Sequence, residues 1–455
     1  MGLFSTAFKA ECSKGVAIDG VALPGAPDVF PVLTLALPSG TRRYCSEGLA
    51  VTADGPCEPR IRRWGSIARS VNARSPELAS VEVSPELSDI PDPGTTTRVF
   101  ATEVARYPRQ LRRVAATIEL VSPNVPNADA FTVFSGILEG WDQAERMTWR
   151  LRLRPDDTRL QYGQILKATI TPEDWPNAAP DAYGVYCPII YGIHSSDSLG
   201  GGGMVPTYCV HQASGVYLVA LGTIDDITAV YSDGAVVPTT DYARADATVN
   251  GKRVTLIDFT SDRGEEVITA DVRGLTTDAT GAGSLITNPM RQFEHLANNF
   301  IWADWRAQPY ETATAPLDSD SLDTVADFLD AMGHEGSRWI GGTEPVAALQ
   351  ELQTFLTSHE ARAYWKNNGD LAFAVNDHRT TNIYLAYPWF VGDHDEGEGF
   401  AIQYDTQGLL REMTVRFVWG QVASKYHQTV RVQDLGVSDP VSRELALQWS
   451  ASRVV

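Results

Sequence analysis

Short segments rich in β-branched and aromatic residues, each bounded by Gly, Pro or Asn, fill much of the first third of the chain. They cover residues 29–35, 114–121, 131–138 and 147–153. Runs of this length and composition, punctuated by turn residues, predict strands. The sequence therefore begins with a β-rich domain.

The last of these segments alternates strictly in polarity. One face carries Met147, Trp149, Leu151 and Leu153, and the other carries Thr148, Arg150, Arg152 and Arg154. A period of two with an arginine face predicts a half-buried antiparallel strand, at a sheet edge or at a contact with another protein.

A second β-rich unit is predicted for residues 184–275, after a Pro-rich segment near residues 172–180 that is typical of a linker. Ser232-Asp233-Gly234 and Asn250-Gly251 each predict a hairpin turn between two strands. Several short strands at this spacing indicate a small sandwich or barrel.

Three amphipathic helices are predicted next, at about residues 288–301, 321–332 and 344–363. Their expected starts are Asn288-Pro289, Asp320-Ser321 and Thr343-Glu344-Pro345, and Gly333 is the expected end of the second. Strands follow at 371–375, 382–387, 400–404 and 411–419. The fold class is therefore mainly β with α+β parts.

The charge of the chain is strongly asymmetric. The 455 residues hold 37 Lys+Arg and 57 Asp+Glu, a formal net charge of −20. Residues 1–160 hold 19 of each sign, so the whole excess lies in residues 161–455. This indicates at least two bodies with different surroundings. An acidic second body argues against a DNA-binding groove but suits a passage through which DNA slides without sticking.

Several protein classes are disfavoured by the composition. No apolar run approaches the roughly 20 residues of a membrane-spanning helix, and the N-terminus shows no secretory signal. Five scattered cysteines form no C-x-x-C pair, which favours reduced, mostly buried thiols.

The search for chemistry assigns no catalytic, cofactor-binding or metal-binding residue. Neither a P-loop, G-x-S-x-G, H-E-x-x-H nor an EF-hand loop is present. Gly200 to Gly203 favours a hairpin tip over a phosphate cradle, since no Lys-Ser or Lys-Thr follows. Two sets of side chains leave metal binding open. One is His194, Asp197 and His211, and the other is Asp393, Asp395 and Glu396. For each set, an exposed polar loop is the preferred interpretation.

Three phrases in the order in which they occur resemble the hub proteins of tailed-bacteriophage tail tips and baseplates. The first is FTVFSGILEG at residues 131–140, and the second is EEVITADVRG at 265–274. The third is the helical segment 346–363 followed by YWKNNGDL at 364–371. Similar proteins are the hubs of T-even phages, gene transfer agents and contractile injection machines.

The resemblance implies two tube-type β-barrel domains, residues 1–170 and 285–455, joined by a small β-rich insertion at residues 180–280. It also implies a homotrimeric ring at the tail tip or baseplate of a virion, made in the bacterial cytoplasm, which closes the tail tube and leaves a channel for genome ejection. Its partners would be a tail tube or distal tail protein, a tape measure protein and a spike or central fibre. DNA would pass transiently, without specific binding. The family's pattern has further strand and helix after residues 439–443, where this sequence departs from it, which leaves open whether a spike-docking extension exists here or on another chain.

Two other functions remain open. The 11 Trp and 16 Tyr, several of them in β-rich segments, suit a carbohydrate- or receptor-binding tail module. The six that suggest it are Trp64, Trp141, Trp149, Tyr183, Tyr186 and Tyr191. A cell-wall hydrolase is the third hypothesis. The hub is preferred, and with it a protein that is not an enzyme and needs no cofactor.

Overall fold

The computed structural model describes residues 30–375 and three strands between residues 412 and 446. Within residues 30–375 the gaps are 47–50, 53–54, 66, 71–77, 79, 92–95, 97, 123–129, 167, 198–199, 265, 279–280, 282, 304–314 and 360. The chain divides into two units. Unit 1 is residues 1–163, 316–321 and 363–373, and unit 2 is residues 164–315, 322–362 and 374–455.

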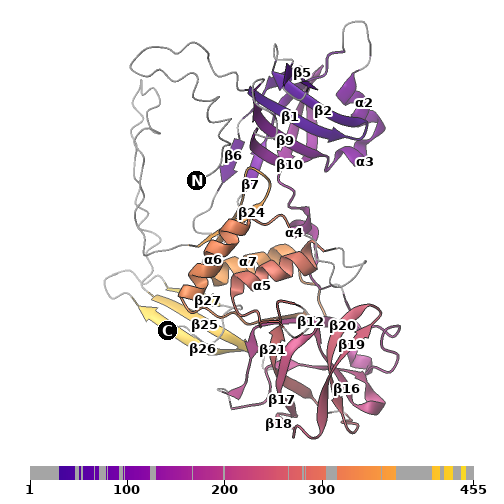
Figure 1. Ribbon diagram of the computed structural model, residues 1–455, viewed down its shortest axis with the longest axis vertical. Coiled ribbons are helices and arrows are strands. Elements are labelled where there is room, and N and C mark those ends of the chain that lie inside the picture. The colour runs from indigo at the N-terminus through magenta and orange to yellow at the C-terminus, as the bar shows by residue number, and fades with distance from the viewer. Residues whose placement is uncertain are drawn as a thin grey trace. The chain divides into compact units, whose positions relative to one another are not determined.

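Unit 1 contains a closed seven-stranded β-barrel in the order β10-β9-β1-β2-β5-β8-β11, because β10 pairs with both β9 and β11 (Figure 1). The strands are β1 (Phe30–Leu37), β2 (Gly40–Ser46), β5 (Glu58–Arg63), β8 (Glu86–Ser88), β9 (Ala115–Val121), β10 (Phe131–Glu145) and β11 (Thr148–Arg154). The pairs are antiparallel except for the parallel pair β2–β5. The mainly β fold class is confirmed.

The interior of the barrel is filled by apolar side chains that alternate along the strands. Leu33 and Leu35 of β1 and Leu151 and Leu153 of β11 are fully buried. Every second side chain of a strand points to the same side, so each strand supplies the core with alternate side chains. At seven strands the interior is narrow enough for side chains to fill it.

Shorter elements complete unit 1. Outside the barrel, β7 (Ser80–Val83) pairs with β11 at one position and with β6 (Ile67–Ser70), the terminal strand of this sheet. The others are β3 (Val51–Thr52), β4 (Gly55–Pro56), α2 (Val99–Arg106), α3 (Pro108–Leu111) and α4 (Thr158–Tyr162). The later strand β24 (Leu371–Val375) pairs with β23 (Ala361–Trp365).

The Asp89 carboxylate joins helix α2 to the barrel. It is 1% exposed and accepts hydrogen bonds from the backbone N–H groups of Phe100 and Ala101, both at 2.9 Å. It also accepts one from Trp149 Nε1 at 3.1 Å. Asp89 therefore satisfies the first turn of α2, whose own N-cap residue Arg98 makes no side-chain cap bond.

We expect Asp89→Ala to destabilise unit 1 by roughly 2–4 kcal/mol, because one buried and two half-buried donors lose their shared carboxylate acceptor at once. Chemical denaturation followed by tryptophan fluorescence measures the change. Asp156→Ala is the matched control, since Asp156 is exposed and accepts only one local N–H. Equal unfolding midpoints for the two variants would contradict the role given to Asp89.

Unit 2 begins with two antiparallel sheets (Figure 1). The first has β13 (Ile193–His194), β14 (Val205–Pro206), β17 (Ile224–Ser232), β18 (Ala235–Val236) and β21 (Ile268–Leu275). The second has β15 (Tyr208–His211), β16 (Val216–Leu221), β19 (Tyr242–Val249) and β20 (Lys252–Phe259). The 3-10 segments are η3 (Pro180–Ala182) and η5 (Gln212–Ser214). The segment predicted as a linker is packed here, with Ala178 and Ala179 buried and Ala179 N bonded to Cys209 O, because its apolar residues cover the sheet.

The two predicted hairpin turns are confirmed. Asp233 and Gly234 join β17 to β18 with φ values of 47° and 82°, and Asn250 and Gly251 join β19 to β20 with 47° and 78°. Two successive positive φ angles define the tight turn whose twist matches that of the flanking strands.

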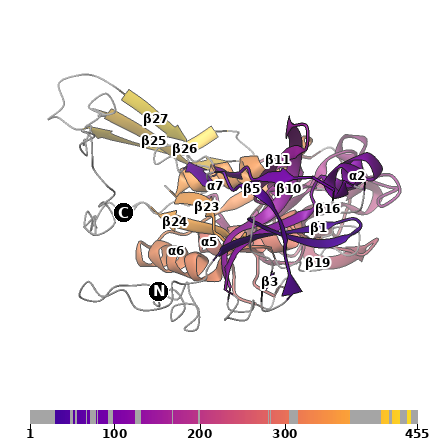
Figure 2. The ribbon, with the colours of Figure 1, turned by 90° about the horizontal axis from the view of Figure 1, so that it is seen from above.

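Unit 2 continues with helices and one strand pair. The helices are α5 (Pro289–Leu296), which continues as the π-helical segment η6 (Ala297–Ile301), α6 (Ser319–Ala331) and α7 (Ala348–Ser358). Strand β12 (Tyr186–Tyr191) pairs with β22 (Arg338–Gly342). The rings of Phe293 in α5 and Phe355 in α7 stack at 5.2 Å, and Asn288 Nδ2 donates to Ala326 O of α6. Figure 2 shows the three helices from a second direction.

The expected helix ends are partly confirmed. Asn288 caps α5 by accepting from Met290 N and Arg291 N, and Gly333 follows α6 with φ 67°. The cap of α6 is Asp318, whose Oδ2 accepts from Ser321 N, so the predicted Asp320-Ser321 start was two residues too late. Helix α7 begins later than residue 344, because Ala347 bridges to Gln164 and Val346 O accepts from Ile165 N in extended backbone.

Strands β25 (Glu412–Gly420), β26 (Lys425–Gln433) and β27 (Ser442–Ala446) form a separate three-stranded sheet in the order β26-β25-β27. Most of residues 376–455 lie outside the described residues, so the second tube-type barrel, expected at 285–455, stays a prediction. Among the helices that the structure describes, none is long and apolar enough to cross a membrane.

Candidate functional site

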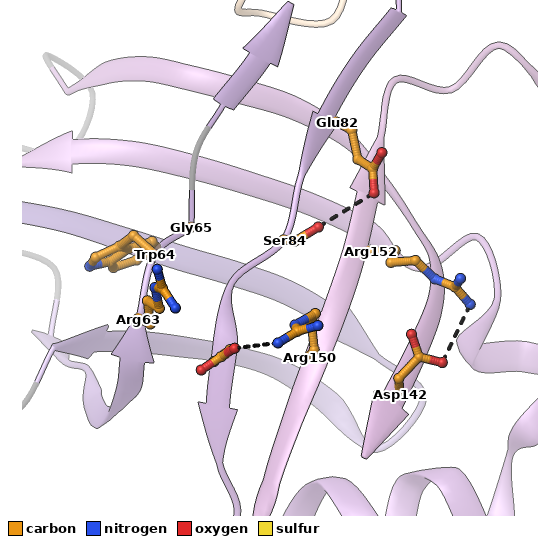
Figure 3. A pocket seen from close by; sticks show the side chains of 9 residues that line it. Arg63, Trp64, Gly65, Glu82, Ser84, Asp142, Arg150 and Arg152 are labelled. Atoms are coloured by element: carbon orange, nitrogen blue, oxygen red, sulfur yellow. Dashed lines mark hydrogen bonds and ion pairs between the residues drawn. The ribbon is translucent and has the colours of Figure 1, made fainter. Parts of the chain in front are cut away.

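An open groove of about 770 Å³ lies on the outer wall of the unit 1 barrel (Figure 3). The ends of β5 and β8, strands β7, β10 and β11, and the segment after β5 provide its walls. Nine residues line it: Arg63, Trp64, Gly65, Glu82, Ser84, Glu86, Asp142, Arg150 and Arg152. Six of these are charged, three of each sign, and we call this surface the charged groove.

The arginine face of β11 forms the centre of the charged groove. Because Leu151 and Leu153 fill the barrel interior, Arg150 and Arg152 must point outward, and they are 52% and 47% exposed. The strand lies inside the sheet, since β10 pairs along one side and β8 and β7 along the other. The prediction of a sheet edge was therefore wrong: the outward arginines meet carboxylates on neighbouring strands, which lets β11 pair on both sides.

Cross-strand ion pairs order these arginines. Arg150 Nη2 lies 2.9 Å from Glu86 Oε1 of β8, and Arg152 Nη2 lies 3.7 Å from Asp142 Oδ1 of β10 (Figure 3). Exposed pairs of this kind contribute at most about 1 kcal/mol each. They set the positions of the charges more than they stabilise the barrel.

The other wall of the charged groove is set by a close backbone approach. Gly65 has φ +70°, and a Cβ there would lie 2.6 Å from Ser84 O. Only glycine allows the chain after β5 to pass so near β7 and β8. The preceding Trp64 is half-buried, and its Nε1 donates to Ser46 Oγ at 2.8 Å. The adjacent Arg63 is exposed, and no ion pair or hydrogen bond joins its side chain to another described residue.

The chemistry of the charged groove suits a polypeptide partner. Its guanidinium and carboxylate groups offer both donors and acceptors, and Trp64 offers an apolar ring. Arg63 and the long Arg152–Asp142 pair leave cationic capacity for an incoming carboxylate. Alternate side chains along a strand present such groups at regular spacing to an extended segment.

The histidine set does not come together as a metal site. His194 is 5% exposed and bonds to Tyr191 O at 3.1 Å, and burial lowers its pKa to about 4. His211 instead contacts Asn177 and Ser214, and Asp197 is exposed. Over the residues that the structure describes, no three His, Cys, Asp or Glu side chains gather as metal ligands. Asp393, Asp395 and Glu396 lie outside those residues.

The Gly200–Gly203 segment is tied down by a buried carboxylate. Asp271, 1% exposed, accepts from Ser196 Oγ at 2.7 Å, from Tyr231 OH at 3.0 Å and from Met204 N at 3.0 Å. Gly203 N in turn donates to Ser196 Oγ. These bonds fix the end of the glycine turn and give Asp271 a structural role.

The aromatic residues highlighted in the sequence mostly pack inside the units. Trp141 and Trp149 both contact the ring of Phe100, and Tyr191 is fully buried beside His295. Tyr183 donates to Trp175 O, and Tyr186 lies half-buried in β12. Of the six, Trp64 is the one that lines the charged groove.

The sequence showed the arginine alternation of β11 but not the groove. Glu86 and Asp142 are 64 and 10 residues from their partners Arg150 and Arg152, so only the barrel register brings them together. The Trp64-Gly65 pair, a ring followed by a glycine at the end of a strand, was the available signal on the opposite wall.

Comparison with known proteins assigns the chain to no family. No family model matches it, and no curated protein matches it. Among solved structures, a chain from "Virion of native gene transfer agent (GTA) particle" is similar, with 13% sequence identity and a TM-score of 0.26. The match covers 59% of this chain and 84% of that chain. At this TM-score the similarity supports no conclusion about family or function.

Proposed function

We propose that the chain is a non-enzymatic structural component of a phage-like virion, a hub that closes the distal end of the tail tube and leaves a passage for DNA. The observation that carries the proposal is the closed barrel of unit 1, whose interior is filled and whose outer wall carries the charged groove. Because side chains fill the interior of the barrel, its outer wall is the surface that remains for binding. A mixed polar and apolar wall of this kind suits a subunit that is held in place by contacts with other proteins. The three ordered phrases in the sequence support the same role.

Immunogold labelling of virions from the organism that encodes the chain tests this proposal. We expect gold at the distal end of the tail. Label distributed along the whole tube, or particles that carry no label, would reject the hub. Mass photometry and negative-stain imaging of the purified chain then report whether a trimeric ring forms.

Reversing two charges in the charged groove is expected to reduce incorporation into particles at least tenfold, because like charges placed across an interface cost several kcal/mol. Arg63→Glu with Arg152→Glu is the variant of choice, since Arg63 has no described partner and Arg152 only a long one. The control is Arg146→Glu with Arg159→Glu, two exposed arginines outside the groove. Particle counts after complementation provide the measurement, and equal counts for both variants would contradict the role of the groove.

A carbohydrate-binding tail module is the second candidate, and the half-buried Trp64 ring in the charged groove favours it. A glycan array on the purified chain tests this function, with Trp64→Ala as the control. Glycan binding by the wild-type chain that disappears in the variant would support the carbohydrate-binding module over the hub. The hydrolase hypothesis is tested separately by the clearing of a peptidoglycan suspension.

A further inference from the structure

Four exposed arginines crowd one short stretch of unit 1. Helices α2 and α3 and the residues after them carry Arg106, Arg109, Arg112 and Arg113, and we call these four the basic surface. No hydrogen bond or ion pair joins their side chains to another described residue. The only acid between residues 98 and 114 is Glu103, which is 4% exposed and does not offset the surface charge.

The backbone holds the last of these arginines in an unfavourable conformation. Arg113 has φ 73°, in the left-handed region that non-glycine residues rarely adopt, and its N–H donates to Leu138 O at 2.8 Å. Such a residue persists where its surroundings fix it, and the cost is often associated with function. The dipole at the C-terminus of α2 explains why one cation, Arg106, is favourable there, but it does not explain four arginines together.

A matching anionic surface lies on helix α6. Asp320, Asp323, Asp327 and Asp330 are all exposed and spaced three and four residues apart, which places them on one face over about 15 Å. We call them the aspartate stripe. The helix contains no basic residue, and Asp330 lies in its last turn, where the helix dipole disfavours an anion. Three of the four have partners: Arg291 neutralises Asp323 at 2.6 Å, Asp330 Oδ1 accepts from Asn288 Nδ2 at 2.7 Å, and Lys366 attracts Asp320. No such partner is placed at Asp327 among the described residues.

We propose that the basic surface of one copy of this chain docks on the aspartate stripe of a second copy. Four exposed arginines meet a row of four exposed aspartates, of which Asp327 has no partner among the described residues. The arrangement of charge over the whole chain agrees, because the excess of 20 negative charges lies in residues 161–455 while residues 1–160 are neutral. Copies that meet head to tail therefore bring unlike surfaces together, whereas two acidic bodies face to face repel.

The contact is heterologous, since different patches on the two copies meet, and such contacts extend into closed rings or open filaments. This inference deepens the proposed function, since it names the surfaces by which a ring would assemble. The proposed function and the proposed contact are tested by different experiments. Gold labelling locates the chain in the particle, whereas self-association in solution tests the contact.

Analytical ultracentrifugation of the full chain at about 0.1 M NaCl, where charges interact over roughly 10 Å, provides the test. Wild-type chain is expected to self-associate and to dissociate at 0.5 M NaCl. Arg109→Glu with Arg112→Glu is expected to weaken association at least about 100-fold, as like charges meet at the contact. The control Arg146→Glu with Arg159→Glu, with the same change in net charge, is expected to associate as the wild type does.

Mixing two defective variants gives the sharpest result. Asp320→Arg with Asp327→Arg should also fail to associate alone, because its stripe repels the basic surface. An equimolar mixture with R109E/R112E should associate again, since each variant then offers the surface that complements the other. A misfolded variant cannot produce this rescue.

Three outcomes would overturn the proposal. A wild-type chain that remains monomeric at 0.1 M NaCl shows that the two surfaces do not bind each other. Association that survives in R109E/R112E places the contact elsewhere and leaves the hub role intact. Binding of a fluorescent duplex DNA that R109E/R112E abolishes, with self-association unchanged, assigns the basic surface to nucleic acid.

Discussion

Replacing Arg338 with leucine is expected to destabilise unit 2 by roughly 3–5 kcal/mol, because the Glu351 carboxylate would remain buried without its cation. Arg338 Nε lies 2.6 Å from Glu351 Oε1, and Nη2 lies 2.7 Å from Oε2. The side chains are 11% and 1% exposed. This two-point pair joins strand β22 to helix α7, so its loss affects the packing of both elements.

A double variant separates the buried charge from the lost packing. Arg338→Leu with Glu351→Leu removes both charges and is expected to be more stable than Arg338→Leu alone, since apolar side chains can replace a buried ion pair at little cost. Urea denaturation of the three proteins provides the comparison. Strictly additive losses would show that the two side chains do not act as a pair.

Acidification from pH 7 to pH 4.5 is expected to unfold unit 2 while unit 1 stays folded. All eight histidines of the chain lie in residues of unit 2. Burial lowers the pKa of His194 and His295 to about 4. Burial, with His334 nearby, lowers the pKa of His359 to about 3.

The direction of the effect follows from proton uptake. The pKa of an unfolded histidine is near 6.5, whereas in the folded unit the pKa is about 4 for His194 and His295 and about 3 for His359. Their contribution to stability is complete above pH 6.5 and is lost as the pH falls toward the folded values, because the unfolded chain binds the extra protons. Each shift corresponds to roughly 3 kcal/mol, and three together approach the whole stability of an ordinary domain.

The charges around these histidines do not reverse this effect. Asp271 favours the protonated form of His194 and Arg338 disfavours it, while burial remains the largest influence. In unit 1, hydrogen bonds from Lys366 and Ser321 outweigh burial and lower the pKa of Asp318, so that carboxylate loses its contribution to the stability of unit 1 only at lower pH.

Hydrogen exchange of the full chain, read by mass spectrometry peptide by peptide, distinguishes the units. Unit 1 serves as the internal control because it contains no histidine. His359→Leu is expected to reduce the dependence of the unfolding free energy on pH between 6 and 4.5 by about one proton. Equal protection of unit 2 at pH 7 and pH 4.5 would contradict the expectation.

The sequence predicted local structure well where a single element decides it. The strands near residues 30, 115, 131 and 148 follow from β-branched runs and period-two alternation, and the Asp233-Gly234 and Asn250-Gly251 turns follow from their tolerance of positive φ. Residues 361–365 are strand β23 and not the end of the third helix, because pairing with β24 outweighs the helical pattern.

The charged groove could not be predicted because it depends on barrel closure. Arg150 and Arg152 were visible as an outward row, but an arginine row on an edge strand and one on a central strand look the same in sequence. What distinguishes them is the register that sets Glu86 and Asp142 opposite. The close approach at Gly65 has the same origin, since Ser84 O belongs to a segment almost 20 residues away.

The division of the chain into units also determines the order in which they can be completed during synthesis. The backbone crosses between the units after residues 163, 315, 321, 362 and 373, and one of these crossings lies within helix α6. The last piece of unit 1 leaves the ribosome only after more than 200 further residues have followed the barrel strands. The first unit to begin folding is therefore completed late. Cleavage after residue 163 would leave residues 1–163 held to residues 316–321 and 363–373 of the same unit by non-covalent contacts alone.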